Sequence, residues 1–313
     1  MAFGGSNVVR SELDTSGFVP MLWSDEIQAA HKANLVLATV VRKLNVKGKR
    51  GDTVVLPKPT RGDASAKAAN TIVTTLIASG GASVQIALDA HWEYSRLIED
   101  IAEVQSLASV RRFYTDDAGY ALAKAKDNVI FQRSELFNGG TATTLAGGLV
   151  WDKAVIAGDG TTAFVDAAGN ANATAITDAG IRRAIQVLDD SDIPMNNRSL
   201  VLPPVARRIM MGLARFSEQA FVGDGKTIRN GKLGDVYGVE VFVSTNAPVP
   251  CAATTVKIGL LLHKDAMILA NVLGPRVQTQ YKQEYLATLL TADTIFGVAE
   301  AYDAGGLALA MPA

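Results

Sequence analysis

Residues 110–137 have the sequence VRRFYTDDAGYALAKAKDNVIFQRSELF, in which apolar side chains recur every three or four positions. At a rise of about 1.5 Å per residue, this periodicity predicts an amphipathic helix of about seven turns and roughly 40 Å. Such a length is unusual for an ordinary domain, so we expect a spine against which other elements pack. Gly139 and Gly140 end the helix. The apolar stripe consists of Val110, Phe113, Tyr114, Ala118, Ala121, Leu122, Ala125, Val129 and Leu136.

The sequence before the spine begins with an arm and a shorter helix. Residues 1–20 are polar and glycine-rich without periodicity, which indicates an extended arm. Over residues 23–44 the apolar positions recur at helical spacing, and Gly48 ends this predicted helix.

A long β-rich excursion follows at residues 48–88. Residues 53–56 predict a strand that Pro57 and Pro59 stop, and a polar tip separates it from further β-rich sequence at 71–88. The excursion has few large apolar residues, so it cannot form a core of its own. A connection of this length is usually functional or bound to a partner.

The sequence after the spine mixes helices and strands without a regular β-α-β alternation, which predicts an α+β fold. Residues 138–176 are rich in Gly, Ala, Thr and Asn and predict irregular surface loops. The expected helices are 177–188 and 205–216, and the expected strands are 199–202, 236–244, 256–262, 276–281 and the end of 283–297.

Composition excludes several classes of protein. The 313 residues suffice for about two lobes at roughly 150 residues each, and 48% hydrophobic with 19% charged residues indicates a globular chain. Lys and Arg (30) nearly balance Asp and Glu (31), which argues against a protein that wraps DNA by neutralising phosphates. Cys251 is the only cysteine, which excludes an intrachain disulfide and a thiolate zinc site. The sequence shows no signal peptide or membrane-spanning run, so we expect synthesis in the cytoplasm.

No motif supports a catalytic, cofactor or metal site. Residues 223–227 (GDGKT) end like a phosphate-binding loop, but Ala220 occupies the required first glycine position. The three histidines, His31, His91 and His263, lack a second ligand at metal-binding spacing. No Gly-x-Ser-x-Gly elbow accompanies the serines.

Charge distribution is the most informative feature. Residues 42–67 carry eight basic and two acidic residues, a net charge of +6, whereas residues 89–103 carry five acidic residues against Arg96, a net charge of −4. Both segments can be ordinary solvated faces that contribute little. Alternatively, the basic excursion of one subunit lies on the acidic segment of a neighbour and sets the register. The candidate contact residues are Arg42, Lys47, Lys49, Arg50, Lys58, Arg61, Lys67, Glu93, Glu99, Asp100 and Glu103.

The order of these elements resembles the Hong Kong 97-type major capsid proteins of tailed bacteriophages, most closely the short-tailed podovirus branch. The resemblance spans nearly the whole chain and depends on the order of individually loose motifs. These motifs are residues 84–89 (VQIALD), 97–101 (LIEDI), 112–114 (RFY), 121–123 (ALA) with Asp127, 198–204 (RSLVLPP), 234–241 (GDVYGVEV) and 263–266 (HKDA), with a closing region around 297–298.

The resemblance implies an α+β fold of four parts. Residues 1–47 would be the N-terminal arm and helix, and 48–90 the extended β-loop. Residues 91–140 with 270–313 would form a peripheral domain that contains the spine helix. Residues 141–269 would form the axial domain.

The function implied is that of a structural major capsid protein in the virion, with no enzymatic activity and no cofactor. Copies would self-assemble into pentamers and hexamers of an icosahedral head that encloses double-stranded DNA without sequence-specific binding and without a membrane. The implied partners are a portal, a decoration or cement protein and a separate scaffolding protein, since no large scaffolding segment precedes residue 20. Two alternatives stay open at this point: an encapsulin-type nanocompartment shell protein and, more distantly, a soluble α+β enzyme.

Overall fold

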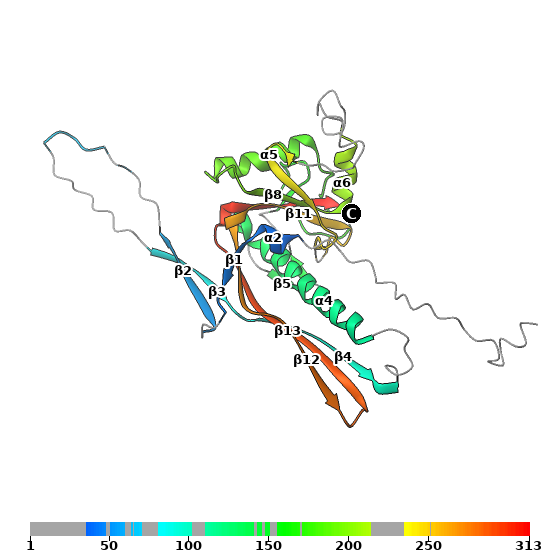
Figure 1. Cartoon of the computed structure of the whole chain (residues 1–313). Helices are drawn as coiled ribbons and strands as arrows, with labels where there is room; N and C mark the ends of the chain where they lie inside the picture. The colour runs from blue at the N-terminus through cyan, green and yellow to red at the C-terminus, as the bar shows by residue number, and fades with distance from the viewer. Residues whose placement is uncertain are drawn as a thin grey trace, which may run out of the picture.

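In the described part of the chain, two large β-sheets are joined by a shared core, and a two-stranded hairpin projects to one side (Figure 1); β5 (Thr143–Leu145) and β6 (Gly148–Val150) form a further small antiparallel pair. The structure is a computed structural model. The residues it describes are 36–47, 51–59, 64, 66–70, 81–101, 110–140, 143–145, 148–150, 155–169, 171–213, 235–250 and 252–313.

The spine helix is confirmed as α4 (Val110–Arg133), which has 24 residues and runs along the first sheet (Figure 1). Its Ala118 and Leu122 pack against Ala292 and Tyr94 of that sheet. A 3-10 helix, η1 (Ser134–Gly139), continues the chain beyond α4. The helix therefore supports the sheet along its length, as expected of a spine.

The first sheet has four strands in the order β1-β12-β13-β4. β1 pairs parallel with β12, and the other pairs are antiparallel. We call β4, residues 272–282 of β12 and residues 287–295 of β13 the distal ribbon, because they extend beyond β1 to the turn at 283–286. The strand bounds are β1 (Arg42–Asn45), β4 (Ala90–Glu99), β12 (Met267–Lys282) and β13 (Ala287–Glu300).

The second sheet has six strands in the order β7-β14-β11-β8-β10-β9. Because neighbouring residues of a strand point to opposite faces, Leu200 and Leu202 pack under the helices while Val201 faces the other core. The helices are α5 (Asp178–Asp190), capped by the Thr177 hydroxyl, and α6 (Pro204–Met211). The strand bounds are β7 (Val155–Ala157), β8 (Arg198–Leu202), β9 (Asp235–Val236), β10 (Val239–Val243), β11 (Val256–His263) and β14 (Gly306–Pro312).

One apolar cluster joins the two sheets. It contains Phe131 from α4, Leu262 from the second sheet and Phe296 from the first. The short helix α2 (Leu37–Val40) is buried in the same cluster. The Asp127 carboxylate on α4 accepts hydrogen bonds from the backbone N–H groups of Val36 (3.3 Å) and Ala38 (3.0 Å) and so fixes α2 to the spine. Burial raises the pKa of Asp127 despite these bonds.

The β-rich excursion begins and ends as an antiparallel pair, which we call the extended hairpin: β2 (Thr53–Pro59) and β3 (Gly81–Ala87). Ile86 anchors its root in a cluster with Val46, Ile268 and Ala301. The expected stop at Pro57 is wrong, because β2 continues to Pro59. The two prolines are spaced two residues apart, and an edge strand accepts proline where the missing N–H would point away from the partner.

Other differences from the sequence-based expectation arise where pairing partners are distant. The described part of the predicted helix 23–44 is helical only over α2, and Arg42–Asn45 forms β1 because it pairs with β12; residues 23–35 lie outside the description. The predicted loop at 138–176 contains β5 (Thr143–Leu145), β6 (Gly148–Val150) and β7. β14, expected in the peripheral part, instead pairs with β11 and β7 in the second sheet.

Two glycine-to-alanine changes are expected to have opposite effects on stability. A Cβ at Gly180 in α5 would lie inside van der Waals distance of the Gly158 carbonyl oxygen, so Gly180→Ala should destabilise by about 1–3 kcal/mol. Gly119 in α4 is exposed with open space around it, so Gly119→Ala should stabilise by about 0.5–1 kcal/mol. Urea denaturation of both variants checks this, and equal effects would contradict the close approach at Gly158.

Candidate inter-subunit surface

Two of the candidate basic residues make contacts within their own chain. The Arg42 guanidinium lies 3.9 Å from Asp265, and both side chains are about half exposed. The Lys58 ammonium donates to the carbonyl oxygen of Ala301 at 3.0 Å and lies 4.7 Å from the centre of the Tyr302 ring. Lys58 therefore ties the extended hairpin to the body of its own subunit.

Of the remaining basic candidates, the structure describes two and leaves three outside the described residues. Lys47 and Lys67 are exposed, at the entry to the hairpin and in its tip. Lys49, Arg50 and Arg61 lie outside the described residues.

The acidic candidates follow β4 along the distal ribbon. Glu93 and Glu99 are exposed. Asp100 accepts a hydrogen bond from the Tyr281 hydroxyl at 2.8 Å, and this bond to the neutral hydroxyl raises the pKa of Tyr281. Glu103 lies outside the described residues. Glu93 and Glu99 thus lie along β4 in the ribbon, and Asp100 lies just beyond the end of β4.

The extended hairpin and the distal ribbon project in different directions. Figure 1 shows the extended hairpin leaving the body on one side, while the distal ribbon runs away from it toward the turn between β12 and β13. Within the described part of the chain, the structure therefore does not bring the tip residues 66–70 and the acidic end of β4 together. The exposed charges of the described candidates, on Lys47, Lys67, Glu93 and Glu99, are left available for contacts outside the subunit.

The distal ribbon also exposes large apolar side chains, which sequence analysis missed. Tyr285 and Leu286 at its turn are 64% and 66% exposed. Exposed apolar residues gathered on one element are typical of an interaction surface. The signal in the sequence was the apolar run at 283–297, but its burial depends on strand pairing. The exposed set on the ribbon and just beyond it is Trp92, Leu97, Ile101, Val277, Tyr281, Tyr285 and Leu286.

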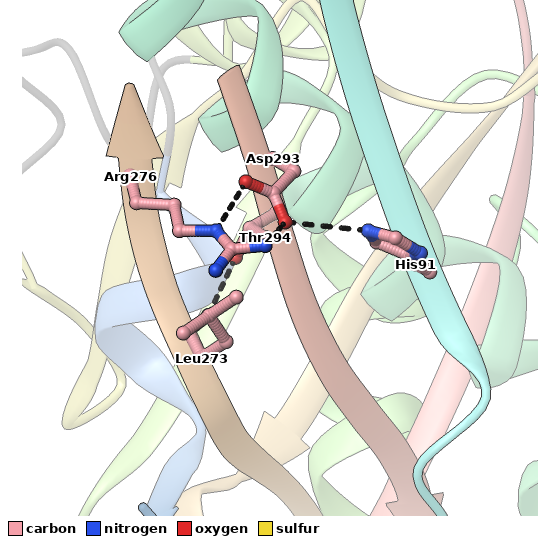
Figure 2. Close-up of polar contacts among 5 residues, drawn as sticks. All are labelled: His91, Leu273, Arg276, Asp293 and Thr294. Carbon is pink, nitrogen blue, oxygen red and sulfur yellow. Dashed lines mark hydrogen bonds and ion pairs between the residues drawn. The ribbon is translucent and has the colours of Figure 1, made fainter. Parts of the chain in front are cut away.

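A buried carboxylate clamps the three strands of the ribbon together. Figure 2 shows Arg276 of β12 and His91 of β4 reaching Asp293 of β13 from either side. Arg276 donates two hydrogen bonds of 2.7 and 2.9 Å, and the His91 Nε2 lies 3.4 Å from the carboxylate. The Arg276 guanidinium holds the pKa of Asp293 below its usual range. Next to it, the Thr294 hydroxyl donates to the Leu273 carbonyl at 2.9 Å, where the β12–β13 register is irregular.

Replacing Asp293 with asparagine should remove an acid-dependent part of the stability. A carboxylate with a lowered folded pKa stabilises above the unfolded value of about 3.9, and this contribution is lost as the pH falls through the folded pKa. The thermal midpoint of wild type, measured from about pH 6 downward, should therefore fall more steeply than that of Asp293→Asn. Glu93→Gln, directly opposite on β4, is the control and should behave like wild type. If the thermal midpoint of Asp293→Asn fell with pH as steeply as that of wild type, the proposed role of the Asp293 contacts would be contradicted.

The histidines take structural positions where they are described. His91 belongs to the clamp, and the His263 Nδ1 accepts from the backbone N–H of Asp265 at 3.2 Å. His31 and residues 223–227 lie outside the description. Among described residues, no group of three metal-ligating side chains gathers in one place. No described helix has the length and apolar character needed to cross a bilayer.

The class of protein follows from comparison with known sequences. The sequence matches the family model described as phage capsid protein over residues 26–308. The chain therefore belongs to the phage capsid protein family. It is a structural capsid protein of the bacteriophage virion, and not an enzyme.

Solved capsid structures share the fold over almost the entire chain. A structure of Mycobacterium phage Che8 is 20% identical, with a TM-score of 0.72 over 93% of this chain and 97% of its own. The capsid of cyanophage P-SCSP1u is 16% identical, with a TM-score of 0.72 over 94% and 93%. The acid-stable capsid of Helicobacter pylori bacteriophage KHP30 is 13% identical, with a TM-score of 0.72 over 100% of both chains. No protein with a curated description matches. These likenesses confirm the expected α+β, Hong Kong 97-type fold.

Proposed function

We propose that this capsid protein assembles into pentamers and hexamers, and that the extended hairpin of one subunit lies on the distal ribbon of the next. The single observation that carries the proposal is that the extended hairpin and the distal ribbon project from one subunit in different directions (Figure 1). A basic projection and an acidic, partly apolar projection on one subunit favour a head-to-tail contact between copies, because such a heterologous contact closes into rings.

The energetics favour a sum of many modest contacts. Each exposed ion pair is worth about 0–1 kcal/mol, so charge serves mainly to set register and exclude wrong partners. The exposed side chains of the ribbon, such as Tyr285 and Leu286, supply apolar area at about 25 cal/mol per Å². Repeated over the copies of a shell, contacts that are weak singly stabilise the whole.

The same proposal includes a division of the chain into two domains. Residues 91–140, with β12 and β13, form a peripheral domain, and the second sheet with α5 and α6 forms an axial domain. β14 belongs with the axial part because it pairs with β11. The podovirus branch, suggested by sequence alone, stays a prediction.

The proposed head also contains proteins other than the capsid subunit. A portal, a separate scaffolding protein and a decoration or cement protein complete the proposed head. The balanced charge of the chain, net −1, supports enclosure of double-stranded DNA without sequence-specific binding.

Mass photometry and negative-stain microscopy of the purified full chain test the assembly proposal. We expect pentamers, hexamers or closed shells in the mass distribution. A stable monomer at all concentrations and salt conditions would overturn the proposal.

A further inference from the structure

One face of the extended hairpin is attached to the body of its own subunit at two places. Near the root, Val54 of β2 pairs with Ile86 of β3, and both pack in the apolar cluster that contains Ala301. Lys58 lies four residues further along β2, where it pairs with Ala82. Because side chains alternate along a strand, Lys58 points to the same side as Val54 and reaches the same stretch of the body.

The second attachment consists of two contacts of the Lys58 ammonium. It donates a hydrogen bond to the Ala301 carbonyl oxygen at 3.0 Å and lies 4.7 Å from the centre of the Tyr302 ring. A charged donor makes a stronger hydrogen bond than a neutral one, and a cation is attracted to the face of an aromatic ring. The ammonium is therefore held by two different groups of one short stretch, which fixes its direction as well as its distance.

The stretch that receives the ammonium is itself fixed to the core of the subunit. The Ala266 carbonyl oxygen accepts hydrogen bonds from the N–H groups of Ala301 (2.8 Å) and Tyr302 (3.3 Å). Just beyond, the N–H of Gly139 at the end of η1 donates to the Asp303 carboxylate at 2.8 Å. The hairpin thus binds a seat that does not follow it when it moves.

We propose that Lys58 is a positioning residue for assembly, which holds the extended hairpin at one angle to the body of the subunit. Apolar packing is non-directional, so the root by itself permits the hairpin to rock about Ile86. Lys58 is four residues from Val54, about 13 Å at roughly 3.3 Å per residue, and a second attachment at that distance fixes the direction. The hairpin beyond Lys58 is thereby presented to a neighbour along one line.

This role differs from that of a contact residue between subunits. The Lys58 ammonium is engaged within its own chain, so Lys58 acts on the shell through the geometry of the hairpin. Lys47, by contrast, is exposed at the entry to the hairpin. The consequence for assembly rests on the proposed function, whereas the angle itself is a property of the isolated subunit. A test on the isolated subunit therefore fails or succeeds independently of the assembly proposal.

Double electron–electron resonance on the unassembled full chain measures the angle as a distance between two spin labels. One label is attached at Ser83→Cys, on the opposite face of the hairpin from Lys58, and the other at Gln186→Cys, exposed on α5. Cys251→Ser removes the only native thiol from this background. We expect a single narrow distance distribution. Lys58→Met keeps the length of the side chain but loses both contacts, so it should widen the distribution by several ångströms.

Conservative variants separate positioning from a general loss of structure. Lys58→Arg keeps a cation with donors and Tyr302→Phe keeps the ring, so both should retain the narrow distribution. Tyr302→Leu removes the ring and should widen the distribution in part; Tyr302 is 47% exposed, so the core stays intact. Lys47→Met is the matched control and should change nothing.

Three results would overturn the proposal. The first is a broad distribution in the labelled background, and the second is a distribution for Lys58→Met as narrow as that of the background. The third is equal widening by Lys58→Arg and Lys58→Met, which would indicate a packing role without the cation. Circular dichroism of each variant checks that the subunit is folded.

Discussion

Shell formation is expected to fail when Lys47, Lys49 and Arg50 are all changed to glutamate, while the subunit keeps its fold. The change turns three positive charges at the entry to the hairpin into negative ones that would face the acidic ribbon of the neighbour. Juxtaposed like charges cost several kcal/mol, and each 1.4 kcal/mol is a factor of about ten in an equilibrium constant. We expect the assembled fraction to fall about tenfold or more at low salt.

Sedimentation velocity measures the assembled fraction, and circular dichroism checks that the subunit is folded. The matched control restores opposite signs on the partner segment: Glu93→Lys and Glu99→Lys are added to the triple variant. Both glutamates are exposed, so this addition leaves the core intact. The quintuple variant should recover part of the assembly. Normal particles from the triple variant would refute the electrostatic contact between hairpin and ribbon.

The second large effect is expected from Phe131→Ala, which should destabilise the subunit by about 3–5 kcal/mol. Phe131 is 1% exposed in the cluster shared by α4 and both sheets. The cavity left by its removal lies where the two sheets are joined, and side chains of both sheets would lose contacts. Many domains have a total stability of only about 5–15 kcal/mol, so soluble yield should also fall.

Urea denaturation of the unassembled subunit measures this loss. Phe113→Ala, near the start of the same helix, is the control because Phe113 is only partly buried and lies outside the shared cluster, with its ring against Tyr114. It should cost less than half as much. Equal losses for the two variants would contradict the assignment of the shared core to the region around Phe131.

The elements that the sequence predicts well are those defined by their own periodicity. The spine lies within its expected range, and α5, β8 and β11 match theirs to within two residues, because helical or buried apolar spacing is local information. The prediction of which face of the spine is buried is less accurate. Ile130 and Phe131 are its most buried large residues, yet neither belongs to the predicted stripe. Which helix residues are buried depends on where the second sheet contacts the helix.

The elements that the sequence could not predict depend on distant partners. Residues 42–45 continue a helical pattern but form a strand because β12, more than 200 residues later, supplies the hydrogen-bond partners. β14 closes the second sheet rather than the first for the same reason. Local spacing carries no information on which sheet a strand joins.

The candidate surface shows the same limit. Net charges of the two segments were visible in the sequence, but the sequence does not show that Lys58 and Arg42 bind within their own chain. The Asp293 clamp joins residues from three strands, with Arg276 and His91 far apart in sequence. Such constellations exist only after the strands have paired.

Cryo-electron microscopy of assembled shells tests most directly whether the shell is built by contacts between the hairpin of one subunit and the ribbon of the next. We expect Lys47 and its basic neighbours within ion-pairing distance, about 4 Å, of Glu93 or Glu99 of the adjacent subunit, with Tyr285 and Leu286 covered. Shells in which the acidic face of the ribbon is open to solvent and the hairpin contacts other surfaces would contradict it.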